Sequence, residues 1–322
     1  MKTILVTGGA GYIGSHTAMQ LAATGFQPVV LDDLSGGRRD FVRWGPMVEA
    51  DVTNASALDA AMQAHSPDAV IHLAGLIDAA DSVRQSERYR RVNVGGTKTL
   101  LEAMARHGVG TLVFSSSAAV YGAPAAASIV EDSPIAPLTP YGSTKAEAET
   151  LIAGAGVQWV SLRYFNAAGA DGSGEIGEAH EPETHAVPLA IAAALGGPAF
   201  TIYGADYATP DGTAVRDYIH VSDLAAAHTR ALAYLGGGGA SIALNVGSGR
   251  GTSVRSLVAA VRRVGGAPVP IREGARRTGD APRLVADIGA AKRRLGWKPL
   301  RSDIDTIVST AWNWHRRREP KP

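Results

Sequence analysis

A tyrosine and a lysine four residues apart, Tyr141 and Lys145, are the side chains whose types and spacing most directly suggest chemistry. On a helix, residues at this spacing share one face, about 5–6 Å from each other. A free tyrosine has a pKa of about 10, and one cation about 6 Å away favours its phenolate by roughly 3 kcal/mol at an effective dielectric of about 20. The pair predicts that Tyr141 takes a proton from an alcohol and that Lys145 lowers the pKa of the phenol. The same spacing also fits two surface residues of an amphipathic helix.

Three serines, Ser115 to Ser117, follow an apolar run at residues 112–114 that is typical of a buried strand. We expect a hydroxyl at the end of this strand to hold the substrate oxygen and to pass the proton to the base.

A glycine-rich turn lies near the start of the chain, with Gly8, Gly11 and Gly14 between an apolar strand and a helix that runs to about residue 24. Glycines at such positions permit a tight turn, close approach of the backbone to a pyrophosphate, and close packing of helix on strand. Asp32 ends the next strand, eighteen residues beyond Gly14, where a carboxylate can bond both ribose hydroxyls of an adenosine. Because this carboxylate would repel a 2′-phosphate, the pattern predicts NAD rather than NADP. Asp51 follows a further strand and is expected either to meet the adenine or to cap a helix.

The elements that must position these residues alternate regularly up to about residue 165. Short runs rich in Val, Ile and Leu are separated by segments of helical period, which predicts a doubly wound parallel α/β sheet. The runs are residues 4–6, 28–31, 69–73, 112–114 and 159–162. From residue 167 the pattern loosens into glycine- and proline-containing loops. We therefore expect a cofactor domain over residues 1–166 and a smaller α/β substrate domain over 167–322, part of which returns to the first domain.

Composition narrows the class of protein further. The 322 residues include 31 Lys and Arg against 30 Asp and Glu, and there is no cysteine. The absence of cysteine excludes disulfides and thiol catalysis. The near balance of charges disfavours a strongly cationic nucleic-acid surface. No apolar run approaches the roughly 18 residues that span a membrane. We expect a cytoplasmic enzyme with no nucleic-acid or membrane partner.

Four segments together, residues 6–17, 115–122, 162–166 and 212–221, resemble the extended short-chain dehydrogenase/reductase family. Within that family the last segment, Gly212 to Val221, resembles the branch that epimerises UDP-hexoses at C4. The resemblance implies NAD as cofactor, a UDP-sugar as substrate, and a homodimer formed through the helix that begins at Tyr141 and the helix before it. It also implies transient oxidation at C4, rotation of the 4-ketosugar and reduction on its other face.

The resemblance assigns roles to individual residues. The catalytic set would be Tyr141, Lys145 and Ser117. The cofactor would be held by Gly8, Gly11, Tyr12, Ile13, Gly14, Asp32, Asp51, Val52, Leu73, Ala74, Gly75, Asn93, Ser115, Tyr141, Lys145 and Phe165. The substrate would be held by Ser117, Tyr141, Asn166, His185, Tyr203, Arg216, Arg277 and Asp280.

Some positions depart from the family pattern or leave alternatives open. Ile77 stands where the family often has a basic residue, and His185 stands where some members have asparagine. Leu284 occupies a place where some members have a tyrosine that closes the sugar pocket, so either N-acetylated UDP-hexosamines also fit or Leu284 merely packs.

Three other functions can be compared with this one. A nucleotide-sugar dehydratase or decarboxylase of the family would carry an acid where this chain has Ala118 and Ala119. A non-catalytic NAD-binding protein would not need the Tyr, Lys and Ser set. A metal site is not expected, because His180 and His185 are five residues apart with a proline between them and cannot form the i, i+4 helical pair of such sites.

Overall fold

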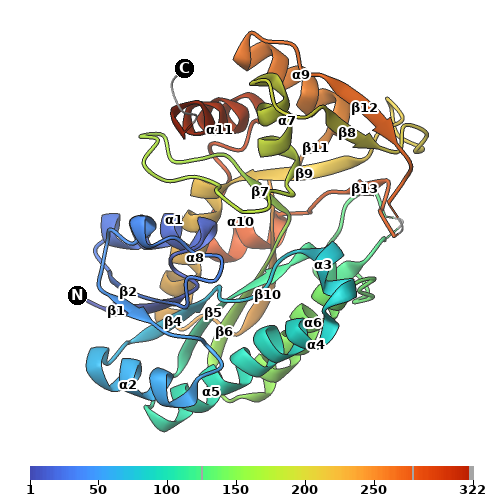
Figure 1. Cartoon of the computed structure of the whole chain (residues 1–322). Helices are drawn as coiled ribbons and strands as arrows, with labels where there is room; N and C mark the ends of the chain where they lie inside the picture. The colour runs from blue at the N-terminus through green and yellow to red at the C-terminus, as the bar shows by residue number, and fades with distance from the viewer. Residues whose placement is uncertain (125, 278, 319–322) are drawn as a thin grey trace.

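The computed structural model, which describes residues 1–124, 126–277 and 279–318, is built around a seven-stranded sheet (Figure 1). Its strands are β1 (Thr3–Thr7), β2 (Gln27–Asp32), β3 (Met47–Glu49), β4 (Ala69–His72), β5 (Thr111–Ser117), β6 (Gln158–Tyr164) and β10 (Ile242–Val246). Their order is β10-β6-β5-β4-β1-β2-β3, and all neighbours are parallel. The predicted doubly wound parallel sheet is therefore confirmed.

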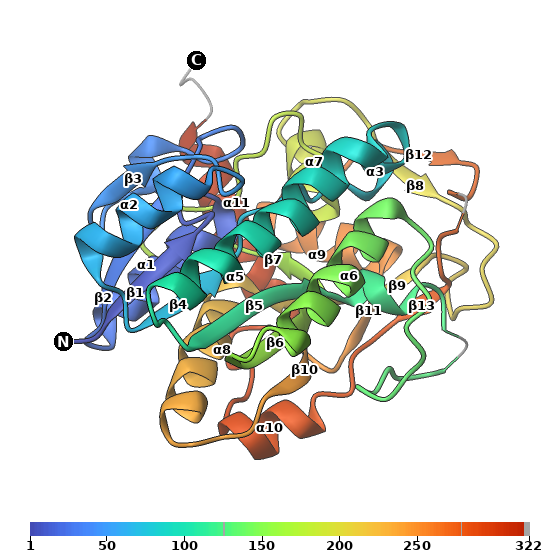
Figure 2. The same cartoon turned by 90° about the horizontal axis from the view of Figure 1, so that it is seen from below.

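Helices cover both faces of this sheet, which explains why its strands read as continuous apolar runs. On one face lie α1 (Tyr12–Ala23), α8 (Val221–Gly236) and α10 (Gly289–Leu295). The other face is covered by α2 (Ala55–His65), α5 (Gly96–Arg106) and α6 (Pro140–Gly154), which cross in front of the strands in Figure 2. Shorter helical segments are η1 (Arg39–Phe41), α3 (Ala79–Arg84), α4 (Ser86–Tyr89), the π-helical η2 (Arg90–Gly95) and η3 (Ala118–Tyr121).

The rest of the chain forms a smaller unit at the carboxyl ends of the central strands, in the upper part of Figure 1. Its strands are β7 (Asn166–Ala168), β8 (Phe200–Tyr203), β9 (Val215–His220), β11 (Gly251–Ser253), β12 (Ile271–Gly274) and β13 (Arg283–Leu284). Its helices are α7 (Ala186–Ala194), α9 (Val254–Gly265) and α11 (Ile304–Arg318). In one sheet β9 pairs with β7, β11 and β13, and a second sheet pairs β8 with β12. The three helices share a separate apolar core, which includes Ile191, Val261 and Val308.

Two helix ends are held by contacts outside the helix. The helix α8 begins at Val221, and the imidazole of His220 accepts the hydrogen bond of the Ser222 N–H. The last turn of α11 ends at Arg318, and Arg317 Nη1 donates to Ser173 O at 2.7 Å; residues 319–322 lie outside the described part. None of the helices in the described residues has the length and apolar character needed to cross a bilayer.

Candidate active site

The glycine turn joins the end of β1 to α1, and its backbone is too tightly packed for side chains. Gly8 has a φ of +71°, and a Cβ on it would lie 2.6 Å from the Ala74 nitrogen. A Cβ on Gly14 would lie 2.1 Å from the Gly8 oxygen, and one on Gly11 would lie 3.3 Å from the same atom. Such a turn leaves backbone groups accessible to a pyrophosphate at the start of a helix, so these residues fit the phosphates of a dinucleotide.

Asp32 is fixed beside this turn at the end of β2. Its carboxylate accepts hydrogen bonds from Ala10 N at 3.0 Å and Leu34 N at 2.9 Å. Burial raises the pKa of Asp32, and the two backbone bonds oppose that rise. The carboxylate is therefore held rigidly at the strand end, as recognition of a ribose requires.

The other residues predicted to contact the cofactor follow the neighbouring strands. Asp51 accepts from Thr53 N at 2.8 Å within a turn before α2, while the side chain that caps α2 belongs to Asn54, so Asp51 is not the cap. Val52 is buried beside it. Leu73 and Ala74 continue from β4, where Leu73 N donates to Thr7 O at 3.0 Å.

Three of the predicted cofactor residues, Gly75, Asn93 and Lys145, come together although they are far apart in sequence. A Cβ on Gly75 would lie 2.9 Å from Asn93 Oδ1 and 3.8 Å from Lys145 Nζ. The Asn93 side chain accepts from Leu76 N at 2.8 Å and donates to Thr144 Oγ1 at 3.0 Å. Asn93 thus ties the loop after β4 to α6, the helix that carries the catalytic pair.

The predicted base, Tyr141, lies at the start of α6. Thr139 caps this helix by accepting from Gly142 N, and Pro140 occupies its first turn. Burial raises the pKa of Tyr141, and a side-chain hydrogen bond with Ser117, at the end of β5, lowers it in part. The structure therefore places the Ser117 hydroxyl beside Tyr141. For the protein by itself, however, the expected sign of the pKa shift is wrong, because the sequence argument counted the charge of Lys145 and not the burial.

Lys145 lies one turn further along α6 and is itself buried. Its Nζ donates to Ser115 O at 2.9 Å and lies 5.0 Å from the centroid of the Phe114 ring. Burial lowers the pKa of Lys145 to about 8, and the charge of Glu149 raises it in part. Ser115 therefore contributes its backbone oxygen here, while its hydroxyl lies 2.7 Å from His228 Nε2 in the core.

Two residues of this region were missed in the sequence. Tyr164, at the end of β6, has a pKa raised by burial and, to a smaller extent, by the charge of the predicted base Tyr141. Glu149 accepts from Ser116 Oγ at 2.5 Å and from Arg163 Nη2 at 2.6 Å, with both charged side chains nearly buried. Glu149 lies four residues after Lys145, and this spacing was the available signal.

The residues expected to hold the substrate lie mainly in the smaller unit. Arg216, on β9, forms an ion pair with Asp280, and its Nη1 also donates to Val215 O at 2.9 Å. The Arg277 guanidinium lies 4.0 Å from the centroid of the Tyr203 ring. These are two guanidinium groups, a carboxylate and an aromatic ring, a set that suits a diphosphate and a nucleoside.

Two further predicted neighbours of the site lie where β6 leads into β7. Phe165 is buried, and its N–H donates to Val246 O at 3.2 Å. Asn166 begins β7, is exposed, and pairs with Tyr218 of β9. Tyr218, the strand partner of Asn166, is two positions along β9 from Arg216.

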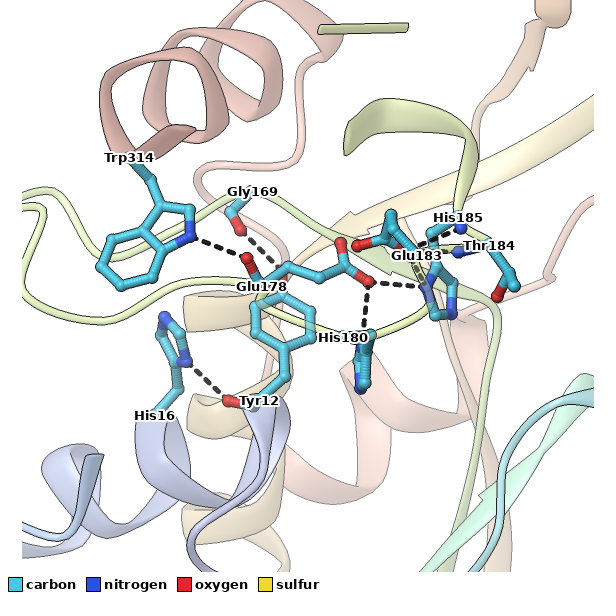
Figure 3. A network of polar contacts seen from close by, with 9 residues as sticks. All are labelled: Tyr12, His16, Gly169, Glu178, His180, Glu183, Thr184, His185 and Trp314. Carbon is cyan, nitrogen blue, oxygen red and sulfur yellow. Dashed lines mark hydrogen bonds and ion pairs between the residues drawn. The ribbon is translucent and has the colours of Figure 1, made fainter. Parts of the chain in front are cut away.

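His185 belongs to a polar cluster in the loop before α7 (Figure 3). Its Nδ1 lies 2.8 Å from Glu178 Oε1 and 2.9 Å from Glu183 Oε1. Burial opposes a charge on His185, but the two carboxylates outweigh it and raise the pKa to about 10. Tyr12 lies against the same cluster, and its hydroxyl donates to Gly169 O at 2.6 Å. Burial and the charges of Glu178 and Glu183 raise the pKa of Tyr12.

The architecture and this site define a nucleotide-sugar-modifying enzyme with a dinucleotide cofactor, and the model of the NAD dependent epimerase/dehydratase family matches residues 4–247. The chain belongs to this family. It is 50% identical over 322 residues to the UDP-glucose 4-epimerase of Rhizobium meliloti, with 98% of each chain covered.

Solved structures give the same result. The chain is 47% identical to the UDP-glucose 4-epimerase of Brucella ovis in complex with NAD, with a TM-score of 0.95 and 97% and 98% of the two chains covered. It is 39% identical to the enzyme of Stenotrophomonas maltophila, solved with NAD and formylated UDP-arabinopyranose, with a TM-score of 0.95 and 98% of both chains covered.

Proposed function

We propose that this protein is an NAD-dependent isomerase that interconverts UDP-hexoses, UDP-galactose and UDP-glucose, at C4. The observation that carries the proposal is the contact between the buried Tyr141 and the half-buried Ser117 at the end of β5, with Lys145 one helical turn away. The glycine turn follows β1, which is two strands away from β5 in the same sheet. The relatives named above, which are similar over nearly the whole chain, support the same activity.

We assign a separate role in proton transfer to each of three residues. Tyr141 takes the proton of the sugar 4-hydroxyl and later returns it, and Ser117 holds that oxygen. Lys145 supplies positive charge that favours the phenolate. NAD, when bound, accepts the hydride from C4 and gives it back. Gly8, Gly14 and Asp32 would hold its phosphates and adenosine ribose.

Epimerisation also requires the sugar to present both faces. The nucleotide half would be anchored by Arg216, Arg277 and Asp280, with Tyr203 beside the base. If binding energy is concentrated on the uridine diphosphate, the sugar can turn without release of the intermediate. Elimination of water is disfavoured, because Ala118 and Ala119 bring no acid to the end of β5.

The decisive variant is Tyr141→Phe, with Tyr234→Phe as the matched control. Tyr234 lies on α8, where its hydroxyl donates to Ala240 O at 3.0 Å, away from the site. With UDP-galactose as substrate and a UDP-glucose-specific dehydrogenase reporting product, Tyr141→Phe should lose about 10²–10⁴-fold in turnover and the control should not. NAD released on denaturation should be equal in both. Turnover of Tyr141→Phe near that of the wild type would remove Tyr141 from the mechanism. A wild type that shows no turnover of UDP-galactose would favour another substrate if NAD is bound, and a wild type with neither turnover nor bound NAD would contradict the proposed function.

A second candidate is activity on N-acetylated UDP-hexosamines. Leu284 on β13 pairs in register with Arg216, which places a medium-sized apolar side chain beside the proposed diphosphate contact. Leu284→Tyr should reduce turnover of UDP-N-acetylgalactosamine much more than that of UDP-galactose. Equal effects on both substrates would mean that Leu284 only packs against the core. The homodimer and the cytoplasmic location stay predictions, and light scattering after size-exclusion chromatography tests the first.

A further inference from the structure

We propose that Glu178, His180, Glu183 and His185 form a binding site for one divalent transition-metal ion of the zinc type. The site lies in the loop between β7 and α7, and it shares His185 with the residues predicted to hold the substrate. Each of the four residues offers one ligand atom, and these atoms all lie within 4.8 Å of one another (Figure 3).

The spacing of the four ligand atoms is close to what such an ion needs. A zinc ion with imidazole nitrogens and carboxylate oxygens about 2.0–2.2 Å away in a tetrahedron separates its ligands by about 3.3–3.6 Å. Glu178 Oε1 lies 3.3 Å from His180 Nδ1 and 2.8 Å from His185 Nδ1, and Glu183 Oε1 lies 2.9 Å from His185 Nδ1. Forming the tetrahedron would therefore take an outward movement of about half an ångström at the shorter contacts and an inward movement at the widest pair, whose atoms lie up to 4.8 Å apart.

The donor set is also chemically suitable. Two imidazoles and two carboxylates are ligands that zinc and its first-row neighbours accept, and two carboxylates balance the charge of a divalent ion. Because the carboxylates keep His185 protonated in the free protein, binding of the ion would release that proton to solvent. The Glu178 side chain is only 3% exposed, and a carboxylate so far from water needs cationic or hydrogen-bonding partners.

The loop that carries the cluster is held in place from outside. The Trp314 indole of α11 donates to Glu178 O at 2.7 Å, and the Tyr12 hydroxyl of α1 donates to Gly169 O at 2.6 Å. The ring of Tyr12 also meets the ring of His180 edge-on, with centroids 6.3 Å apart. Because both sides of the loop are anchored, little further ordering is needed for the ligands to bind an ion.

The expectation of no metal site rested on the linear spacing of the two histidines, which excludes a helical pair. In the folded chain neither histidine is helical, and the loop turns back so that both Nδ1 atoms face Glu178. A bound ion would fasten the β7–α7 loop next to Tyr12 and would thereby stabilise the connection between the cofactor turn and the smaller unit.

Cobalt(II) is the probe that tests the site, with the full-length protein free of any histidine tag and first dialysed against a chelator. The wild type should bind one equivalent per chain, with the intense visible absorption of tetrahedral cobalt, and zinc should displace it. His180→Gln should weaken binding at least tenfold. His65→Gln, a histidine at the end of α2 and outside the cluster, should bind as the wild type does.

The outcomes separate this site from a simple ion-pair network. Less than one tenth of an equivalent bound at millimolar cobalt, or equal binding by wild type and His180→Gln, would overturn the proposal. If His180→Gln does not fold, as judged by circular dichroism, Glu183→Gln replaces it with the same expected loss. Metal stoichiometry is measured without substrate, so failure of the epimerase assay and failure of the metal site are distinguishable.

Discussion

Replacing Glu149 by glutamine should destabilise the protein and also change the pH dependence of turnover. Glu149 and Arg163 are 12% and 10% exposed, and their shortest contact is 2.6 Å. Removing one partner of a buried pair costs about 3–5 kcal/mol, because the remaining charge has no counter-charge. Arg163 keeps its bonds to the Tyr121 hydroxyl and to Glu131 O, both 3.0 Å long, so we expect the lower end of that range. Urea unfolding measures this cost.

The effect on turnover arises because Glu149 also acts on Lys145. Burial lowers the pKa of Lys145 to about 8, and the Glu149 charge works against that decrease. In Glu149→Gln the pKa of Lys145 should fall further, so the cation is lost at a lower pH. The alkaline limb of kcat, measured from pH 6 to 10 with UDP-galactose, should therefore move to lower pH.

Glu147→Gln is the matched control on the same helix. Glu147 pairs with Arg90 at the surface, with the two side chains 40% and 64% exposed, so its removal should cost about 0–1 kcal/mol and leave the pH profile unchanged. If Glu149→Gln lowers stability but its alkaline limb coincides with that of Glu147→Gln, the electrostatic argument for Lys145 is wrong.

Two further predictions follow from packing and from buried histidines. In Gly14→Ala the new Cβ would lie 2.1 Å from Gly8 O, so the variant should release its NAD, and its free energy of unfolding should decrease by about 1–3 kcal/mol. Gly154→Ala, with no atom within 4 Å of its Cβ, should do neither. Equal NAD content in both variants would contradict the packing argument. Burial lowers the pKa of His72 to about 3 and that of His228 to about 4, so the unfolded chain binds more protons than the folded one between about pH 6.5 and pH 4. The free energy of unfolding should therefore decrease as the pH is lowered through this window, by about 2 kcal/mol per histidine at pH 5. Urea midpoints that do not change between pH 7 and pH 5 would show that these histidines are not buried in their neutral form.

The sequence was most informative where local pattern decides the structure. The strands around residues 4–6 and 112–114, the glycine turn and the helix of Tyr141 depend on apolar runs, missing Cβ atoms and helix capping, all of which are local. The position of β10 beside β6, and the pairing of Glu149 with Arg163, depend on which strands become neighbours after folding. Linear spacing contains little of that information.

The loop around His185 also shows that linear spacing cannot predict tertiary contacts. Spacing rules for metal sites describe ligands on one helix or hairpin, and they correctly exclude such a pair for His180 and His185. They do not describe a loop that buries Glu178 at its centre and directs both imidazoles toward it. Only the tertiary contacts of the loop, with Trp314 and Tyr12, determine that arrangement.

The raised pKa of Tyr141 bears on how the proposed reaction is controlled. Burial keeps this phenol protonated in the protein alone, and the hydrogen bond with Ser117 offsets only part of that effect. Lys145 is four residues away and its Nζ donates to Ser115 O, while the groups that shift the pKa of Tyr141 are its buried surroundings and Ser117. A strong base at Tyr141 therefore requires additional positive charge near the ring, as the oxidised form of the predicted cofactor would provide. This dependence would couple the removal of the proton to the presence of a hydride acceptor, so that a sugar alcohol is not deprotonated when it cannot be oxidised.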